Sequence, residues 1–175
     1  MHLDGARLAN AVAALDCDVR AVTIDAGVDV VSFGGTKNGM MYGEAVVFCD
    51  PARGEHVRFI RKQAMQLPSK MRFVAAQFEA LLTDDLWLRN AMHANAMARR
   101  LADATRDIPG VTLVQEPVVN SLFVRLPRAA IPVLQERSFF WTWDEPTAVV
   151  RWMTSFDTTE TDIDAFAAEV RAVLS

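Results

Sequence analysis

The chain has 175 residues, a net charge of −4 and 51% apolar residues, enough for one domain or for a small domain with part of another. Its apolar runs are too short to cross a bilayer, and its basic residues are dispersed except between residues 58 and 72, so neither a membrane nor a nucleic acid is an expected partner. Cys17 and Cys49 lack the spacing of a metal site. With no leader pattern, the composition predicts a soluble, cytoplasmic chain.

The N-terminal part of the chain predicts a layered α/β sheet. Residues 1–3 end a strand, and residues 6–15 have apolar side chains at helical spacing. Residues 29–33 and 44–49 are further apolar strands. The order strand, helix, strand is typical of a βαβ sheet, which binds its ligands at the carboxyl ends of its strands.

Three helices are predicted next. Pro51 favours the first turn of a helix that extends to about residue 63. A break at residues 67–69 separates it from a helix over residues 70–82. A longer helix over residues 85–108 has small and apolar residues at every third or fourth position, a pattern typical of a core helix.

The C-terminal part predicts a small α+β lobe with antiparallel strands, because its strands follow one another with little helix between them. These strands cover residues 111–114, 120–126, 139–143 and 149–155, and a last helix begins at Thr158 and Thr159. The expected division is therefore a first domain over residues 1–84, a connecting helix over residues 85–108 and a small domain over residues 109–175.

Lys37 and Asp4 are the residues best suited to chemistry. Lys37 follows Gly34 and Gly35 at the end of a predicted strand, where the backbone can turn tightly and approach a ligand. Pyridoxal phosphate (PLP) needs a lysine for its Schiff base and a carboxylate to keep its pyridine nitrogen protonated. Each residue also has a simpler interpretation, since surface loops are rich in lysine and Asp-Gly is a common turn pair.

Three longer motifs resemble one family. They are His-Leu-Asp-Gly-Ala-Arg-Leu-Ala-Asn-Ala at residues 2–11, Ser-Phe-Gly-Gly-Thr-Lys-Asn-Gly at residues 32–39 and Val-Arg-Trp-Met-Thr-Ser-Phe-Asp-Thr-Thr at residues 150–159. The motifs are similar to those of the low-specificity L-threonine aldolases of the aromatic amino acid β-eliminating lyase group. The resemblance covers nearly the whole chain. It implies an α/β fold, with part of the large domain of a fold-type I PLP enzyme followed by a small α+β C-terminal domain.

The resemblance also implies roles for single residues. Lys37 matches the catalytic Schiff-base lysine, and Asp4 matches the partner of the pyridinium nitrogen. Arg7 matches an arginine that faces the cofactor and the substrate carboxylate. Arg151 matches the carboxylate-binding arginine of the small domain; without the family it would be interpreted as a surface arginine of an edge strand.

Lys62 and Arg72 resemble a basic pair that, in related aldolases, reaches the cofactor phosphate of a neighbouring subunit. The family has a run of glycines before its Met-Arg pair, whereas this chain has the longer segment of residues 63–70. A solvated basic helix end is the alternative interpretation. The resemblance implies a homo-oligomer, a dimer or a tetramer built from dimers.

The implied reaction is cleavage of L-threonine, L-allo-threonine or related β-hydroxy amino acids to glycine and an aldehyde. Two alternatives stay open: another fold-type I PLP lyase acting on amino acids, and a non-catalytic remnant that forms oligomers. The family's phosphate-binding loop and ring-stacking histidine precede the first motif. We therefore expect the chain to correspond to the C-terminal half of a family member, to be weakly active or inactive alone, and to be completed by a separate N-terminal half.

Overall fold

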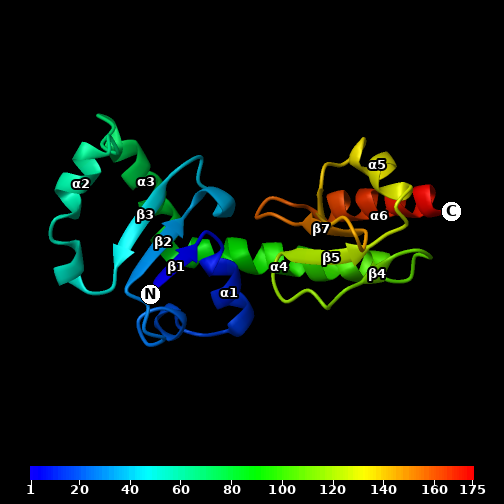
Figure 1. The fold of residues 1–175 in the computed structure, drawn as a ribbon, viewed down its shortest axis with the longest axis horizontal. Coiled ribbons are helices and arrows are strands. Elements are labelled where there is room, and N and C mark those ends of the chain that lie inside the picture. The colour runs from blue at the N-terminus through cyan, green and yellow to red at the C-terminus, as the bar shows by residue number, and fades with distance from the viewer. The chain divides into compact units, whose positions relative to one another are not determined.

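The computed structural model describes residues 1–175, which form two compact units (Figure 1). Unit 1 is Met1–Asn90 and unit 2 is Ala91–Ser175. The division falls within the long helix α4 (Leu86–Thr105), and the sequence predicts a helix over residues 85–108. Each unit has its own sheet and its own core cluster.

The sheet of unit 1 begins with a parallel pair of strands, as the sequence predicts. The chain runs through β1 (His2–Gly5), α1 (Leu8–Leu15), the 3-10 turn η1 (Val19–Val22) and β2 (Val30–Gly34). The third strand, β3 (Glu44–Phe48), pairs with β2 in the antiparallel direction, which gives the strand order β1-β2-β3. The carboxyl ends of β1 and β2 therefore lie at the same edge of the sheet.

The core of unit 1 is small. Its cluster of fully buried residues comprises Leu8 and Val12 of α1 together with Val28 and Val31. Leu8 and Val12 are four residues apart, so both side chains lie on the face of α1 that packs against the sheet. Trp87, near the start of α4, packs against the same cluster.

The remaining elements of unit 1 are short. They are η2 (Thr36–Asn38), η3 (Pro51–Gly54), α2 (Val57–Gln63), α3 (Met71–Leu82) and η4 (Thr83–Asp85). The single helix predicted from Pro51 to residue 63 is thus two elements. The Asp50 carboxylate accepts a hydrogen bond from the Ala52 N–H and caps only the first turn, and Gly54, a weak helix former, ends it.

Unit 2 contains a four-stranded sheet in which every neighbouring pair is antiparallel, as predicted. Its elements are β4 (Thr112–Leu113), β5 (Ser121–Arg125), α5 (Ala130–Gln135), β6 (Trp141–Asp144), β7 (Val149–Met153) and α6 (Glu160–Leu174). The strand order β4-β5-β7-β6 makes β7 a central strand, so Arg151 does not lie on an edge strand. Helix α5, six residues with a proline inside it, is not predicted from the sequence.

One face of this sheet carries the core of unit 2. Leu122, Val124, Val150 and Trp152 alternate along β5 and β7 and are almost fully buried against side chains of α4, α5 and α6. The intervening residues of β5, β6 and β7 form the opposite face, where aromatic side chains remain exposed. None of the helices has both the length and the apolar character that spanning a membrane requires.

Candidate active site

Asp4 and Lys37 lie at the same edge of the unit 1 sheet. In the parallel pairing of β1 with β2, Asp4 is opposite Ser32 and Gly5 is opposite Phe33. Strand β2 then ends at Gly34, and the chain turns through η2, which carries Lys37. Both side chains are exposed. Two strands that are distant in sequence thus bring a carboxylate and an amine to adjacent strand ends, where α/β sheets bind their ligands.

The Asp4 carboxylate is held by the backbone that follows it. Its Oδ1 accepts a hydrogen bond of 3.0 Å from the Ala6 N–H, the pattern of an Asx turn. This bond fixes the direction of the side chain and uses only one of the two carboxylate oxygens. Oδ2 keeps its capacity to accept a hydrogen bond from a cationic group.

Gly5 allows β1 and β2 to approach closely beside Asp4. A Cβ atom at this position would lie 2.7 Å from the Ser32 carbonyl oxygen and 2.9 Å from Cγ1 of Val31. Glycine is therefore required here for space, and this close approach helps to set the spacing between the two strand ends.

Gly35, two residues before Lys37, also leaves little room for a Cβ atom. Gly35 has a right-handed helical backbone, and a Cβ there would lie 1.9 Å from Sδ of Met40. The left-handed conformation falls instead on Gly39, with φ of 111°, immediately after η2. The tight turn predicted at Gly34-Gly35 thus extends through the whole Lys37 loop.

Hydrogen bonds anchor the Lys37 loop on both sides of its tip. Asn38 Nδ2 donates to the Trp87 carbonyl oxygen at 2.8 Å, and Asn90 Nδ2 donates to the Asn38 carbonyl oxygen at 2.8 Å. On the other side, Oε1 of Gln77 accepts from the Met41 N–H at 2.9 Å. Asn38 is 6% exposed while its neighbour Lys37 is exposed, so the loop is fixed below and its lysine faces outward.

Arg7 lies immediately before α1, three residues after Asp4. Its side chain is partly buried and already interacts with other groups of the protein. Chain continuity places it at the same strand end as Asp4, so the structure brings Asp4, Arg7 and Lys37 to one edge of unit 1.

Lys62 and Arg72 are not part of this group in the structure. Lys62 is exposed on α2, which follows β3, a strand that runs antiparallel to β2 and ends at the opposite edge of the sheet. Arg72 is exposed near the start of α3, where its guanidinium lies 4.9 Å from the Phe73 ring centroid. The contact of α3 with the Lys37 loop is made further along, by Gln77.

Arg151 belongs to unit 2. It lies in β7 opposite Phe123 of β5 and Trp141 of β6, and its guanidinium stacks 4.9 Å from the centroid of a Trp143 ring. The side chain is partly buried on the face of the sheet that the helices of unit 2 do not cover.

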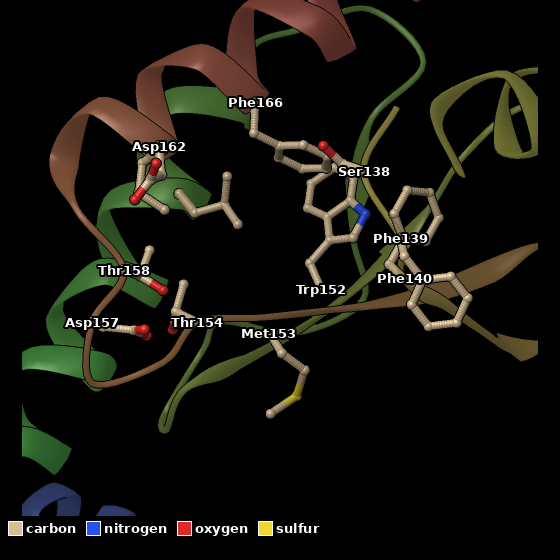
Figure 2. A pocket seen from close by; sticks show the side chains of 12 residues that line it. Ser138, Phe139, Phe140, Trp152, Met153, Thr154, Asp157, Thr158, Asp162 and Phe166 are labelled. Carbon is tan, nitrogen blue, oxygen red and sulfur yellow. The ribbon is translucent and has the colours of Figure 1, made fainter. Parts of the chain in front are cut away.

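Unit 2 also contains a hollow of about 340 Å³ between β7 and α6 (Figure 2). Phe140, Trp152 and Phe166 line it, with Asp157 and Thr158 at another part of its wall. The Trp152 and Phe166 rings pack edge to face at 5.0 Å. None of the site residues predicted from the sequence lines this hollow. Phe140, Trp152 and Phe166 belong to the core cluster or pack against it, while Phe139 at the edge of the hollow is exposed. It is a feature of core packing and not the candidate site.

Three carboxyl groups have clearly lowered pKa values, and none belongs to the candidate site. Hydrogen bonding to the terminal ammonium group, with the charge of Arg53, lowers the pKa of Asp29. The hydrogen-bonded Arg106 guanidinium lowers the pKa of Glu116, and Thr159 lowers that of Asp162. These shifts describe structural ion pairs and a helix cap.

The family follows from comparison with known proteins. Residues 1–129 match the family model described as "Beta-eliminating lyase", which is more than half of the chain and includes Asp4, Arg7 and Lys37. The chain belongs to the β-eliminating lyase family.

Two curated relatives in this family cover the whole of the chain. The low specificity L-threonine aldolase of Pseudomonas sp. (strain NCIMB 10558) is 42% identical over 175 residues, which are 100% of this chain and 51% of that protein. The low specificity L-threonine aldolase of Pseudomonas aeruginosa is 43% identical over 99% of this chain and 50% of its own length. The chain therefore spans about half the length of the curated relatives it matches.

Solved structures show the same fold. The threonine aldolase of Leishmania major superposes with a TM-score of 0.85 and is 29% identical, over 99% of this chain and 52% of that one. A protein described as a putative aromatic amino acid β-eliminating lyase/threonine aldolase, from Exiguobacterium sp. 255-15, has a TM-score of 0.73 over 98% of this chain at 19% identity. The predicted mixed α/β fold, with part of a fold-type I domain, is confirmed.

Three residues that support the predicted site are not predicted from the sequence. Asn38 and Gln77 anchor the Lys37 loop, and Trp143 stacks on Arg151. The alternation of aromatic residues over 139–143 was a visible signal for exposed rings on one strand face, but nothing in the local sequence indicates that one of them meets Arg151. These contacts hold the Lys37 loop and the Arg151 guanidinium, which both belong to motifs of the β-eliminating lyase family.

Proposed function

We propose that the protein carrying this chain is a PLP-dependent lyase that cleaves L-threonine, L-allo-threonine or related β-hydroxy amino acids to glycine and an aldehyde. The observation that carries the proposal is the position of Asp4 and Lys37 at adjacent ends of the parallel strands β1 and β2. The substrate class comes from the Pseudomonas relatives, whose names describe threonine aldolases. Since the chain spans about half of their length, the activity is proposed for the whole protein.

The residues at the strand ends fit PLP. The exposed Lys37 amine would hold the aldehyde carbon of the cofactor, and Oδ2 of Asp4, which the Asx turn leaves available, would pair with its ring nitrogen. When bound, PLP supplies an electron sink for the electrons of the broken Cα–Cβ bond. Asp4 would contribute by keeping the ring nitrogen protonated, so that the ring can accept those electrons.

Arg7 and Arg151 are proposed to bind the substrate carboxylate. A planar guanidinium donates two parallel hydrogen bonds to a carboxylate, which fixes orientation as well as position. Holding the carboxylate in this way would orient the Cα–Cβ bond for cleavage, so the two arginines select which bond breaks.

Lys37 is the residue to test first. The protein is incubated with PLP, reduced with borohydride, digested and analysed by mass spectrometry. We expect the reduced cofactor on Lys37 and not on Lys62 or Lys70, the two other lysines of the chain. The Lys37→Ala variant should lose both the label and glycine release from threonine, while the matched Lys70→Ala variant keeps both. Equal labelling of all three lysines would contradict the proposal.

A comparison of substrates tests the reaction against that of another amino-acid lyase. Threonine, serine and tryptophan are offered to the PLP-loaded protein, and glycine, pyruvate and indole are measured. Glycine and acetaldehyde from threonine support aldol cleavage. Pyruvate or indole as the main product would show β-elimination instead.

Assembly into a homo-oligomer is also proposed, with Lys62 and Arg72 directed to the cofactor phosphate of a neighbouring subunit. Its support is the surface of α2 and of the start of α3, where Phe59, Ile60 and Phe73 are all more than half exposed. Apolar patches of this kind mark interaction sites. Sedimentation of wild type and Ile60→Asp checks this: we expect an oligomer that the substitution weakens, and a wild-type monomer would contradict it. The cytoplasm is the proposed location.

A further inference from the structure

Strand β6 has an irregularity at Trp143. Trp141 is opposite Arg151 and Thr142 is opposite Val150, but the next residue of β7, Val149, is opposite Asp144. Trp143 is therefore the extra residue of a β-bulge. Bulges bend a strand and redirect a side chain, and they are common beside active sites.

The Trp143 ring stacks on the guanidinium of Arg151. Its ring centroid lies 4.9 Å from Cζ of Arg151, within the range of a cation–π interaction. On the neighbouring strand, Phe123 packs edge to face against Trp143 at 5.2 Å. Phe123 is itself opposite Arg151 in the β5–β7 pairing, so three neighbouring strands contribute to one arrangement of two rings and a cation.

Aromatic rings are what hold Arg151 in the structure. Its Nε is buried and has no hydrogen-bond partner, and none of the ion pairs of the protein involves this residue. A guanidinium has five N–H donors, and stacking uses its face and leaves the donors at its edge. The arrangement fixes the plane of the cation without using the edge that a carboxylate would bind.

We propose that Trp143, supported by Phe123, is a positioning residue that holds Arg151 in the plane in which it receives the substrate carboxylate. The inference rests on the proposed role of Arg151 as the carboxylate-binding residue. Trp143 itself acts through Arg151 and has no contact with the reacting atoms in this role. One experiment measures where the Arg151 guanidinium lies, and a second measures its contribution to substrate binding.

The first test measures the position of Arg151 without substrate or cofactor. In the ¹⁵N-labelled chain, the Nε–Hε signal of Arg151 is assigned as the one missing from Arg151→Lys. A ring stacked on the guanidinium shifts this proton upfield. We expect the shift to be lost in Trp143→Leu, which keeps an apolar side chain without a ring, and to be partly kept in Trp143→Phe.

The matched control is Trp141→Ala: Trp141 has similar exposure on the same strand, but the cation does not stack on it. A shift that survives in Trp143→Leu overturns the proposal.

The second test measures threonine cleavage by the PLP-loaded protein. Trp143→Leu should raise KM for threonine roughly 2- to 30-fold, the range of a cation–π pair, with kcat within about twofold. Trp143→Phe should recover most of the loss, and Trp141→Ala should stay near wild type. In an Arg151→Lys background the Trp143 substitution should add little, because the two residues act as one unit.

The outcomes separate the inference from the function on which it rests. If Arg151→Lys leaves KM unchanged, the proposed carboxylate-binding role of Arg151 is wrong, whatever the spectra show. If Arg151→Lys raises KM while Trp143→Leu matches Trp141→Ala, the proposed function stands and the positioning role of Trp143 is overturned.

Discussion

The two units of this chain are similar in length but differ in how much of their apolar surface they bury. The core cluster of unit 2 contains seventeen buried residues, whereas that of unit 1 contains four. Both units expose large apolar side chains: Val46, Phe59, Ile60 and Met65 in unit 1, and Phe139, Trp141 and Trp143 in unit 2. Unit 2 therefore combines an exposed aromatic sheet face with a large packed core, whereas unit 1 exposes apolar side chains over a small one.

This difference matters for function because the predicted site residues are divided between the two units. Asp4, Arg7 and Lys37 lie in the unit with the small core, and Arg151 lies in the unit with the large one. Local unfolding free energies follow local packing, so we expect the strand ends of unit 1 to open more readily than the Arg151 face of unit 2. The predictions below test this contrast.

The same substitution in the two units should have very different effects. Leu134 in unit 2 is 0% exposed, and Leu67 in unit 1 is 45% exposed. Leu134→Ala should lower the free energy of unfolding by about 2–5 kcal/mol, because it removes packed atoms and leaves a cavity. Leu67→Ala should change it by less than about 0.5 kcal/mol.

Urea denaturation followed by tryptophan fluorescence measures both variants, since three of the four tryptophans belong to unit 2. Equal losses for the two variants would mean that Leu67 is covered in solution. In that case the contrast between the units would apply to the single chain and not to the assembled protein.

A methyl group at Gly5 should separate the two strands that carry the site. The added Cβ would meet the Ser32 carbonyl oxygen at 2.7 Å, and a backbone atom cannot move aside as a side chain can. We expect Gly5→Ala to cost about 1–3 kcal/mol of unfolding free energy, the usual cost of overpacking. It should also reduce the labelling of Lys37 by PLP and borohydride.

Gly54→Ala is the control for this change. Its Cβ would come no closer than 3.2 Å, to a ring carbon of Phe48, and it should change stability by no more than about 1 kcal/mol. If both variants lose the same unfolding free energy, the close approach of β1 and β2 does not determine the spacing between the two strand ends.

Removing the amide of Asn38 should loosen the loop of Lys37. Asn38→Ala removes the hydrogen bond to the Trp87 carbonyl oxygen, at a cost of about 0.5–1.5 kcal/mol. Amide hydrogen exchange should become faster over residues 35–40 and unchanged in the strands of unit 2. Gln66→Ala, which removes an exposed amide bonded only to Ala64, should leave exchange in the loop unchanged. An unchanged loop in Asn38→Ala would show that the Asn90 and Gln77 contacts hold it without the Asn38 amide.

Much of the fold follows from local patterns. The parallel β1–α1–β2 unit, the long α4, the antiparallel sheet and the capped α6 are all predicted, because periodicity and caps are properties of short segments. Helix α5 was missed because six residues with a proline inside give almost no periodic signal.

The candidate site is predictable from sequence only in part. Asp4 and Lys37 stand out because each follows a strand, and the pairing of β1 with β2 then brings them to one edge. The anchors Asn38 and Gln77 and the stacking of Trp143 on Arg151 are long-range contacts. These contacts depend on how elements that are distant in sequence pack together. The bulge in β6 likewise has no local sequence pattern that predicts it.

The smallest predicted effect concerns the cap of α6, in the unit with the larger core. Thr159 and Asp162 form a capping box: the Thr159 hydroxyl accepts from the Asp162 N–H at 3.2 Å, and Asp162 accepts from the Thr159 N–H at 2.8 Å. Hydrogen bonding to Asp162, first from the Thr159 hydroxyl and then from its backbone, lowers the pKa of this carboxyl. A carboxyl whose pKa is lower in the folded state stabilises the fold above its unfolded pKa of about 3.9, and this contribution is lost as the pH falls through the folded value. Thr159→Ala should therefore lower Tm by roughly 2–4 °C at neutral pH.

The pH dependence of this loss distinguishes the cap from simple packing. As the pH falls through the folded pKa of Asp162, the part of the Tm difference that depends on the ionised carboxyl should disappear, so the difference between wild type and Thr159→Ala should shrink. The control is Thr161→Ala, an exposed threonine two residues along the same helix, which should match wild type at every pH. A Tm difference that stays constant down to strongly acid pH would mean that the ionised Asp162 adds nothing to the cap.

Because the cap belongs to unit 2, amide hydrogen exchange in the Lys37 loop should be the same in both variants at neutral pH. Faster exchange in this loop in Thr159→Ala would show that the two units do not open independently.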